Sequence, residues 1–231
     1  RGWKWKIVDK LVIFVANLFA DLIIFQSSWS YEQALKLGFN KNKKYSIIHN
    51  AVDSEIFFRN EAIKKEKNKI NLIYTSWSSN PNKGFTYLDF LDKNLDFNKY
   101  QIKFIGNSPI SFKNIKTLRP LPSKELANEL RQSDIFISPA KDDACSNAIL
   151  EALACGLPVV VLNSGSNEEL IGGAGVLFND SYGLLNGLEK VSSDIYTYKH
   201  GIVIKDIKAV SGEYLLAKKI SMLVLIFNKF L

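Results

Sequence analysis

Residues 138–165, SPAKDDACSNAILEALACGLPVVVLNSG, combine the end of an apolar run, an acidic loop and the start of a helical pattern. The loop carries Asp143, and the helix begins near Ser146, a residue type that commonly caps helices. The first turn, which includes Asn147 and Ala148, has backbone N–H groups without partners inside the helix. A helix N-terminus after a strand is a ready anion site, where each charge gains roughly 0.3–1 kcal/mol. The spacing therefore predicts a site for a phosphate-bearing ligand.

A carboxylate stands one turn inside the same helix. Glu151 lies where it could accept hydrogen bonds from sugar hydroxyls. Each piece also has a purely structural interpretation, because capped helices are common and acidic residues such as Asp142 can simply complement the helix dipole. The acidic loop, the capped helix and the inner carboxylate are more specific together than any one of them alone.

The elements around this stretch must hold it at the edge of a sheet. The predicted strands are residues 22–25, 45–48, 70–74, 101–105, 135–138, 158–161 and 175–177. The predicted helices are residues 30–37, 83–91, 123–132, 146–155 and 167–171. This alternation predicts an α/β fold, a Rossmann-like doubly wound parallel sheet with its binding site at the carboxyl ends of the strands.

The chain divides at residues 51–69, which lack a sustained hydrophobic period and end in a charged run. We interpret this segment as a linker. It separates a leading helix–strand–helix piece, residues 1–50, from an α/β domain at residues 70–180. Residues 181–231 are predicted to form C-terminal helices.

These residues resemble a known family. An acidic residue, seven further residues and then EALACGLPVV (151–160) are similar to the signature of retaining GT-B glycosyltransferases, particularly the large family 4. ADLIIFQS (20–27), IIHNAVD (47–53) and NPNKG (80–84) are similar to further motifs of that family. The resemblance covers residues 20–180. It implies the donor-binding C-terminal domain of a GT-B fold with a remnant of the N-terminal domain.

The resemblance implies a role for each matching residue. Lys83 would contact the diphosphate of a nucleotide sugar as a point charge, and the N–H groups of Asn147 and Ala148 would cradle phosphate. These three residues would form the diphosphate part of the site.

The other matching residues would bind the nucleoside and the sugar. Leu121 would pack against the nucleobase, and Glu151 would bind the ribose hydroxyls. Asp143 would hold the hydroxyls of the donor sugar, and Glu169 would approach the same sugar. Asp143 and Lys83 are the expected catalytic residues.

Three positions depart from the family pattern. Asp143 stands where Glu is usual, so its side chain reaches roughly 1.5 Å less. Ser76-Trp77 stand where Gly-Arg is usual, so one positively charged side chain that would bind the diphosphate is missing. The polar residues 78–80 would replace it with weaker hydrogen bonds. NAVD replaces NGVD at the hinge.

The function implied is transfer of a glycosyl group from a UDP- or GDP-linked sugar to an acceptor hydroxyl with retention, an activity of the hexosyltransferase type. The acceptor would be a sugar or a lipid-linked molecule in cell-surface polysaccharide or glycolipid synthesis. No cofactor and no metal are expected, because Lys83 and the helix N-terminus would stabilise the departing diphosphate. The sequence has no Asp-x-Asp motif, and Asp89 and Asp92 are interpreted as solvated charges.

A second hypothesis is a non-catalytic nucleotide-sugar-binding or membrane-docking subunit that needs a partner chain. The incomplete N-terminal domain and Trp77 in place of Arg favour it. A GT-B epimerase or phosphorylase is a third hypothesis, for which we find no matching acid–base or pyridoxal context. Turnover with an added N-terminal domain or partner chain separates the first two hypotheses.

Residues 1–20 predict an amphipathic helix with two interpretations. Its apolar positions are 7, 8, 11, 12, 15, 18 and 19, and Trp3, Trp5 and nearby lysines stand at its start. The helix either faces a core or lies on a membrane surface. Because only the end of an N-terminal domain is present, we expect a truncated chain or one completed by a partner. The expected location is cytoplasmic, with the inner membrane face as the place of any peripheral attachment.

Composition excludes several classes of protein. The 231 residues are 47% hydrophobic and 23% charged, which is typical of a globular protein and excludes disorder, collagen and coiled coil. The longest apolar runs have six residues, against roughly 18 for a bilayer span. Two cysteines and two histidines argue against a disulfide framework and a metal centre. The net charge of +7 suits phosphate ligands or an anionic membrane, while only four arginines argue against nucleic acid.

Overall fold

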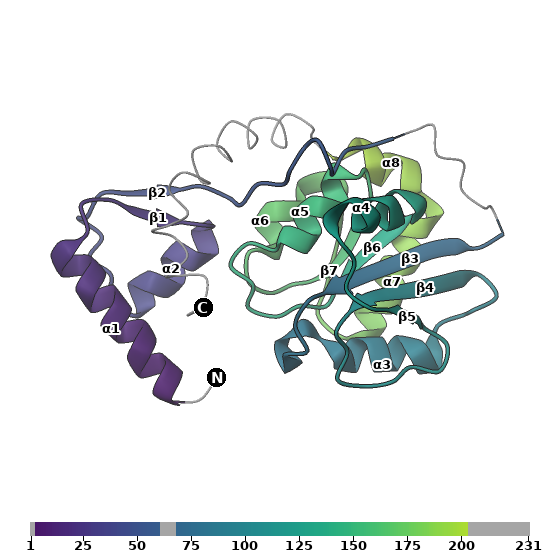
Figure 1. The fold of residues 1–231 in the computed structure, drawn as a ribbon, viewed down its shortest axis with the longest axis horizontal. Coiled ribbons are helices and arrows are strands. Elements are labelled where there is room, and N and C mark those ends of the chain that lie inside the picture. Colours follow the sequence, from purple (N-terminus) through teal and green to yellow (C-terminus); the bar gives the residue numbers. More distant parts are fainter. Residues whose placement is uncertain (1–2, 61–67, 203–231) are drawn as a thin grey trace.

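A computed structural model describes residues 3–60 and 68–202, with side chains from residue 7 onward. The helices predicted beyond residue 202, and the side chains of Trp3 and Trp5, lie outside the described residues. The chain forms a small N-terminal unit and a larger α/β domain, joined by the segment between β2 and β3 (Figure 1).

The larger domain is built on one parallel sheet with the strand order β5-β4-β3-β6-β7-β8. Its strands are β3 (Ile70–Ser76), β4 (Tyr100–Gly106), β5 (Lys116–Leu118), β6 (Ile135–Ser138), β7 (Val159–Leu162) and β8 (Gly175–Phe178). The arrangement confirms the predicted doubly wound sheet. The sequence prediction missed β5 because this short edge strand is largely exposed and carries no apolar run.

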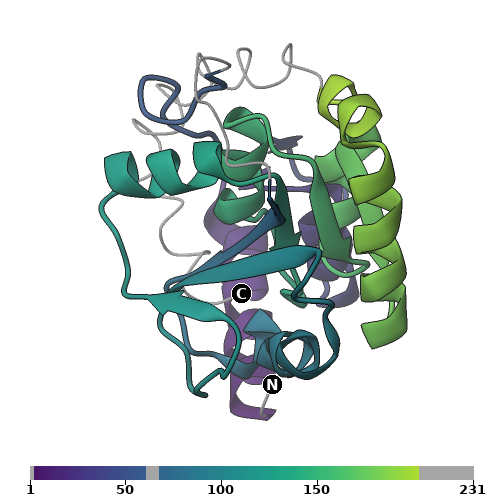
Figure 2. The same cartoon turned by 90° about the vertical axis from the view of Figure 1, so that its right-hand side faces the viewer.

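Helices cover both faces of the sheet (Figure 2). They are the 3₁₀ turn η1 (Pro81–Lys83), α3 (Phe85–Asn94), α4 (Ser123–Gln132), α5 (Asn147–Ala154), α6 (Asn167–Ile171), the 3₁₀ turn η2 (Gly172–Ala174), α7 (Ser181–Ser193) and α8 (Ile195–His200). On one face α3 packs beside α7, where the rings of Phe90 and Tyr182 meet edge to face. On the other face the Cys155 thiol at the end of α5 lies 4.0 Å from the Ala127 carbonyl oxygen of α4.

The central strands are buried on both faces, and their composition reflects this. Strands β6 and β7, IFIS and VVVL, are buried at every residue. Such continuous apolar runs are typical of parallel strands that are covered by helices on both sides. Tyr74 of β3 packs between Phe104 of β4 and Phe136 of β6, with ring centroids 5.6 and 6.4 Å away. The core therefore centres on β3 and its two neighbours.

The N-terminal unit contains α1 (Trp3–Phe19), β1 (Ile23–Phe25), α2 (Ser28–Lys36) and β2 (Tyr45–Ile47). Strands β1 and β2 form a two-stranded parallel sheet. Six buried residues form its core: Ile13, Ala16, Ile23, Phe25, Ala34 and Phe39. A two-stranded sheet is marginal in water, so this small cluster carries most of the unit's stability.

The apolar stripe of α1 faces outward, which corrects the core-facing interpretation. The stripe comprises Ile7, Leu11, Phe14, Val15 and Leu18, each between 45% and 59% exposed. The buried contacts come instead from Ile13 and Ala16 on the opposite side of the helix. The reason is that β1, β2 and α2 offer surface for only one face of α1. No helix of the described residues is long and apolar enough to cross a bilayer.

Asp92 is buried, which corrects its interpretation as a solvated charge. It is 7% exposed on α3. Its carboxylate accepts hydrogen bonds of 2.7–2.9 Å from the backbone N–H groups of Lys113, Asn114 and Ile115. Burial raises the pKa of Asp92, but these three bonds outweigh burial and leave the pKa below its ordinary value. Asp92 thus fixes the loop that leads into β5.

We expect Asp92→Ala to lower the free energy of unfolding by about 3 kcal/mol at pH 7, because three N–H groups lose their partner. Urea denaturation measures the change. The matched control is Asp89→Ala on the same helix, which removes only the exposed ion pair with Lys93 and should cost under about 0.5 kcal/mol. Because its folded-state pKa is lowered, the contribution of Asp92 is present above its ordinary pKa of 3.8 and is lost as the pH falls below it. Equal losses in the two variants would contradict this account.

Candidate functional site

The strand order places the predicted site residues together. The chain moves from β3 outward to β5, then returns to β6 beside β3 and continues to β8. At such a reversal the loops after the two central strands turn away from each other and leave a crevice at their carboxyl ends. Lys83 follows β3 and Asp143 follows β6, so both lie at this crevice.

The backbone around Lys83 is fixed by local contacts. Asn80 caps η1 by accepting a hydrogen bond from the N–H of Asn82 at 2.9 Å. The buried Tyr74 hydroxyl donates to the carbonyl oxygen of Lys83 at 2.8 Å. Gly84 follows with φ 72°, and a Cβ there would lie 2.3 Å from the carbonyl oxygen of Pro139. Glycine therefore allows the loop after β3 to lie directly against the end of β6.

The loop that carries Asp143 is held on both sides. The N–H of Lys141 donates to the carbonyl oxygen of Asn82 at 2.7 Å. Asp142 has a left-handed backbone, with φ 55°, and its N–H donates to Ser164 Oγ at 3.0 Å. A Cβ on Gly165 would lie 2.4 Å from the carbonyl oxygen of Asp143. Contacts with the loops after β3 and β7 thus set the direction of Asp143.

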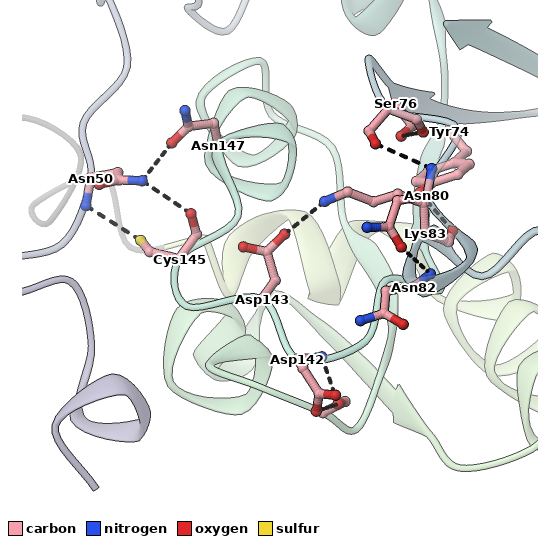
Figure 3. A network of polar contacts seen from close by, with 12 residues as sticks. Asn50, Tyr74, Ser76, Asn80, Asn82, Lys83, Asp142, Asp143, Cys145 and Asn147 are labelled. Atoms are coloured by element: carbon pink, nitrogen blue, oxygen red, sulfur yellow. Dashed lines mark hydrogen bonds and ion pairs between the residues drawn. The ribbon is translucent and has the colours of Figure 1, made fainter. Parts of the chain in front are cut away.

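Lys83 and Asp143 form an ion pair in the crevice (Figure 3). Lys83 Nζ lies 3.2 Å from Asp143 Oδ2, and the two side chains are 33% and 21% exposed. Pairs that remain this accessible to water are typically worth about 0.2–1 kcal/mol. A ligand that carries more negative charge than one carboxylate can therefore draw Lys83 away at small cost.

The start of α5 lies beside this pair. Ser146 occupies the N-cap position as predicted, although its side chain makes no capping hydrogen bond. The side chain of Asn147 accepts a hydrogen bond from Asn50 Nδ2 at 2.8 Å, and this Nδ2 also donates to the carbonyl oxygen of Cys145 at 3.0 Å (Figure 3). Gln26 Nε2 in turn donates to Asn50 Oδ1 at 2.7 Å. Asn50 therefore connects the N-terminal unit to the first turn of α5.

Glu151 lies within α5 and is largely buried. Burial raises its pKa to about 7, from an ordinary value of 4.5. A carboxylate that is this costly to ionise gains most from hydroxyl donors that replace its lost water. The environment of Glu151 is therefore suited to a hydroxyl-bearing ligand.

Leu121 lines a pocket at the carboxyl ends of β3 and β4. The pocket is a shallow hollow that is open to solvent, and its space of about 200 Å³ includes the solvent at its mouth. It is lined by Thr75, Ser76, Trp77, Ile105, Gly106, Pro120, Leu121 and Leu126. Its lining is mainly apolar, which suits a ring rather than a phosphate.

Glu169 contacts the N-terminal unit. Its carboxylate accepts hydrogen bonds from the backbone N–H groups of Ser28 at 2.9 Å and Trp29 at 3.2 Å, at the start of α2. His49 Nε2 lies 3.6 Å from the same carboxylate. Burial raises the pKa of Glu169, but the two backbone bonds outweigh it and leave the pKa below its ordinary value. In this arrangement Glu169 joins α6 to α2, and its approach to a donor sugar stays a prediction.

The two cysteines lie close to the site but are unsuited to nucleophilic chemistry. Burial raises the pKa of both Cys145 and Cys155 to about 12, so both thiols are protonated at neutral pH. Among the described residues, no group of three or more His, Cys, Asp and Glu side chains is arranged to hold a metal.

Sequence reasoning missed Asn50 and His49, whose side chains contact the α/β domain, and Gln26, which donates a hydrogen bond to Asn50. The only sign of them in the sequence is that they lie within two motifs already singled out. Asn50 and His49 belong to IIHNAVD, and Gln26 belongs to ADLIIFQS. The motifs do not show which group these side chains will meet. Asn50, for example, bonds to Asn147, which lies 97 positions further along the chain.

One family model and a curated protein are similar to parts of this chain. Residues 96–194 match the family model described as Glycosyl transferases group 1. A 41.2 kDa protein from the cps region of Klebsiella pneumoniae is 30% identical over 193 residues, which cover 76% of this chain and 53% of that protein. The chain thus spans about half the length of this curated relative.

Solved structures with a similar fold include two proteins that act on or bind sugars. Sucrose-phosphate synthase from Thermosynechococcus elongatus superimposes with a TM-score of 0.76 at 15% identity, over 98% of this chain and 63% of that chain. HepE from Anabaena, in complex with UDP and glucose, superimposes with a TM-score of 0.73 at 18% identity, over 95% of this chain and 67% of that chain. At these identities the likeness establishes the fold, which is that of the GT-B glycosyltransferases.

We expect Glu151→Gln to stabilise the protein at high pH. A raised folded-state pKa means that the folded protein loses stability as the pH rises from 4.5 to about 7, and the loss is complete above that. The neutral amide avoids this cost, so the variant should match the wild type near pH 4.5 and exceed its free energy of unfolding by up to about 3 kcal/mol at pH 8. Urea denaturation across this pH range measures the difference. The control is Glu125→Gln, which changes an exposed residue of α4 and should change the free energy of unfolding by under about 0.5 kcal/mol at every pH. If the free energy of unfolding of Glu151→Gln varies with pH in parallel with that of the wild type, the prediction is wrong.

Proposed function

We propose that this chain forms the donor-binding half of a glycosyltransferase that takes its sugar from a nucleotide-diphosphate sugar. The observation that supports this most strongly is the convergence of Lys83, Asp143 and the start of α5 at the reversal of strand order. A cation, a hydroxyl-binding carboxylate and a helix N-terminus are the groups that a sugar diphosphate needs. The match to the glycosyl transferases group 1 model over residues 96–194 agrees with this function.

The donor would extend across three parts of the crevice. The nucleobase would occupy the pocket beside Leu121, and the ribose hydroxyls would reach Glu151. The diphosphate would lie between Lys83 and the N–H groups of Asn147 and Ala148, with the sugar beside Asp143. HepE, whose structure contains UDP and glucose, shows that the same fold accommodates such a ligand and supports a UDP-linked donor as the first candidate.

Catalysis would rest on charge stabilisation at the leaving group. As the bond between the anomeric carbon and the phosphate oxygen breaks, negative charge develops on the diphosphate. Lys83 would leave its pair with Asp143 to neutralise this charge, and the α5 N-terminus would add its dipole. Asp143, relieved of Lys83, would accept hydrogen bonds from the sugar hydroxyls. We propose transfer with retention by this front-face route, in a family 4 type enzyme, with no metal required.

The biological setting would be the synthesis of cell-surface polysaccharide or glycolipid. The relative from the Klebsiella pneumoniae cps region supports this setting. The acceptor would be a sugar or a lipid-linked molecule that meets the crevice from the side of the N-terminal unit, where Asn50 and Glu169 join the two units. The reaction would take place in the cytoplasm, at the inner membrane face where the acceptor is lipid-linked.

We expect the protein to bind one of UDP, GDP and ADP with micromolar affinity in calorimetric titrations, equally with and without magnesium. Lys83→Ala should weaken binding at least about tenfold, because a phosphate contact to a charged group contributes roughly 1.5–3 kcal/mol. Glu151→Ala should weaken binding by a similar factor through loss of the ribose contacts. The control Lys93→Ala removes an exposed lysine of α3 and should leave the affinity unchanged. Absence of binding by all three nucleotides would contradict the proposed function.

The exposed stripe of α1 supports a further part of the proposal, that additional polypeptide completes the N-terminal unit. Five large side chains, each at least 45% exposed, form one continuous helix face, and such patches mark interaction surfaces. We propose that polypeptide corresponding to the unmatched half of the relatives covers this face and carries the acceptor site. The same face is also the candidate for peripheral membrane attachment.

We expect Leu11→Gln/Leu18→Gln to leave the thermal unfolding of the α/β domain unchanged while it reduces concentration-dependent self-association in sedimentation velocity. The reason is that both side chains are over 55% exposed and contribute little to the core. If the variant self-associates as strongly as the wild type, the exposed stripe of α1 is not the interaction surface. Binding of the wild type, but not of the variant, to anionic liposomes would instead assign the face to a membrane.

A further inference from the structure

Trp77 is the largest exposed side chain in the part of the α/β domain that the structure describes. Its side chain is 68% exposed. Two tyrosines of the same domain are similarly exposed, but each packs on a neighbouring ring: Tyr182 on Phe90 and Tyr196 on His200. An indole in water forgoes the favourable burial of its large apolar surface, so its position at a ligand crevice calls for an explanation.

The backbone of Trp77 is held firmly although its side chain is exposed. Asn107 Nδ2 donates to the carbonyl oxygen of Trp77 at 2.7 Å, and the N–H of Asn107 donates to the carbonyl oxygen of Ser76 at 3.0 Å. The Ser76 hydroxyl donates to the carbonyl oxygen of Ser78 at 2.9 Å. Contacts on both sides of Trp77 therefore fix the direction in which the indole leaves the loop.

Trp77 is one of the residues that line the pocket that also contains Leu121. The other apolar side chains of that pocket are those of Ile105, Pro120 and Leu126. The pocket opens to solvent. An aromatic side chain beside an aliphatic pocket is a suitable site for a flat ring, since one face of the ring can stack on the indole while its edge meets the aliphatic groups.

The same loop connects this pocket to the diphosphate site. Trp77 precedes the short turn η1 that Asn80 caps, and Lys83, six residues after Trp77, is the last residue of that turn. A nucleoside diphosphate with its phosphates at Lys83 would therefore extend toward Trp77 with its base.

We propose that Trp77 stacks on the nucleobase of the donor and closes the pocket over it. This inference rests on the proposed function. Trp77 stands where the resemblance places an arginine that binds the diphosphate. This site therefore gains affinity through the base instead of through a second positively charged side chain at the diphosphate. Stacking accepts any base because every base has a π-face, so Trp77 sets the strength of nucleoside binding and leaves the choice of base to other groups of the pocket.

The test compares Trp77→Ala and Trp77→Phe in calorimetric titrations with UDP, GDP, ADP and inorganic pyrophosphate. We expect Trp77→Ala to weaken the nucleotide that binds the wild type by about 10- to 100-fold, the factor typical of one stacked base. Trp77→Phe keeps an aromatic face and should retain most of the affinity. Pyrophosphate, which has no base, should bind wild type and Trp77→Ala equally. Thermal unfolding confirms that each variant is folded.

The matched control is Tyr196→Ala, which removes an equally exposed aromatic side chain, 72% exposed, from α8. Helix α8 follows α7, which runs back from the carboxyl end of β8, so Tyr196 lies at the opposite edge of the sheet from the crevice. This variant should bind the nucleotide as the wild type does.

The outcomes separate the inference from the proposed function. If the wild type binds a nucleotide and Trp77→Ala binds it equally well, stacking by Trp77 is wrong while the donor site stands. If Trp77→Ala loses affinity for the nucleotide and for pyrophosphate alike, the indole supports the loop that binds the diphosphate, and stacking on the base is again wrong. If the wild type binds no nucleotide, the proposed function fails, and the inference about Trp77 fails with it.

Discussion

The reversal of strand order between β3 and β6 is the constraint on which the rest of the structure depends. Because β3 is the first strand of the domain and β6 is its neighbour on the returning side, their following loops diverge and leave a crevice between them. Lys83, Asp143 and the start of α5 enter the candidate site from these two loops. The parallel sheet is buried on both faces, so its strand ends are rigid supports for side chains that must act together.

That rigid support carries an ion pair that is easily opened. The backbone at Lys83 is fixed by Tyr74 and that at Asp143 by the loop after β7, while the ion pair itself remains accessible to water. This division would suit the proposed exchange of an internal carboxylate for a diphosphate. The N-terminal unit contacts the edge of this site in two places: Asn50 bonds to the start of α5, and the start of α2 bonds to Glu169. Movement of that unit would therefore reach the donor crevice directly.

The sequence predictions failed where an amphipathic pattern had two physical solutions. The apolar stripe of α1 was expected either to face a core or to lie on a membrane surface. Only Ile13 and Ala16 on the other side of the helix reach a core, because two short strands and one helix cannot cover the whole of α1. Asp92 was expected in water because acidic residues usually are exposed. It is buried because the loop before β5 offers three N–H groups that need an acceptor, and no local pattern at Asp92 reveals that loop.

The sequence alone determined the doubly wound sheet, nearly all its strands, the loops that lead to Lys83 and Asp143, and the helix that carries Glu151. Hydrophobic period, helix caps and glycines act within a few residues of one another, so local sequence reveals them. Tertiary structure alone decided which side chains meet. It paired Lys83 with Asp143 across 60 residues, joined Asn50 to α5 across 97, and directed Glu169 to α2 across 141. It also left Trp77 exposed beside an aliphatic pocket whose walls come from three separate segments. Such contacts depend on how elements that are distant in the sequence pack together. The residues that surround each partner in the sequence do not predict that packing.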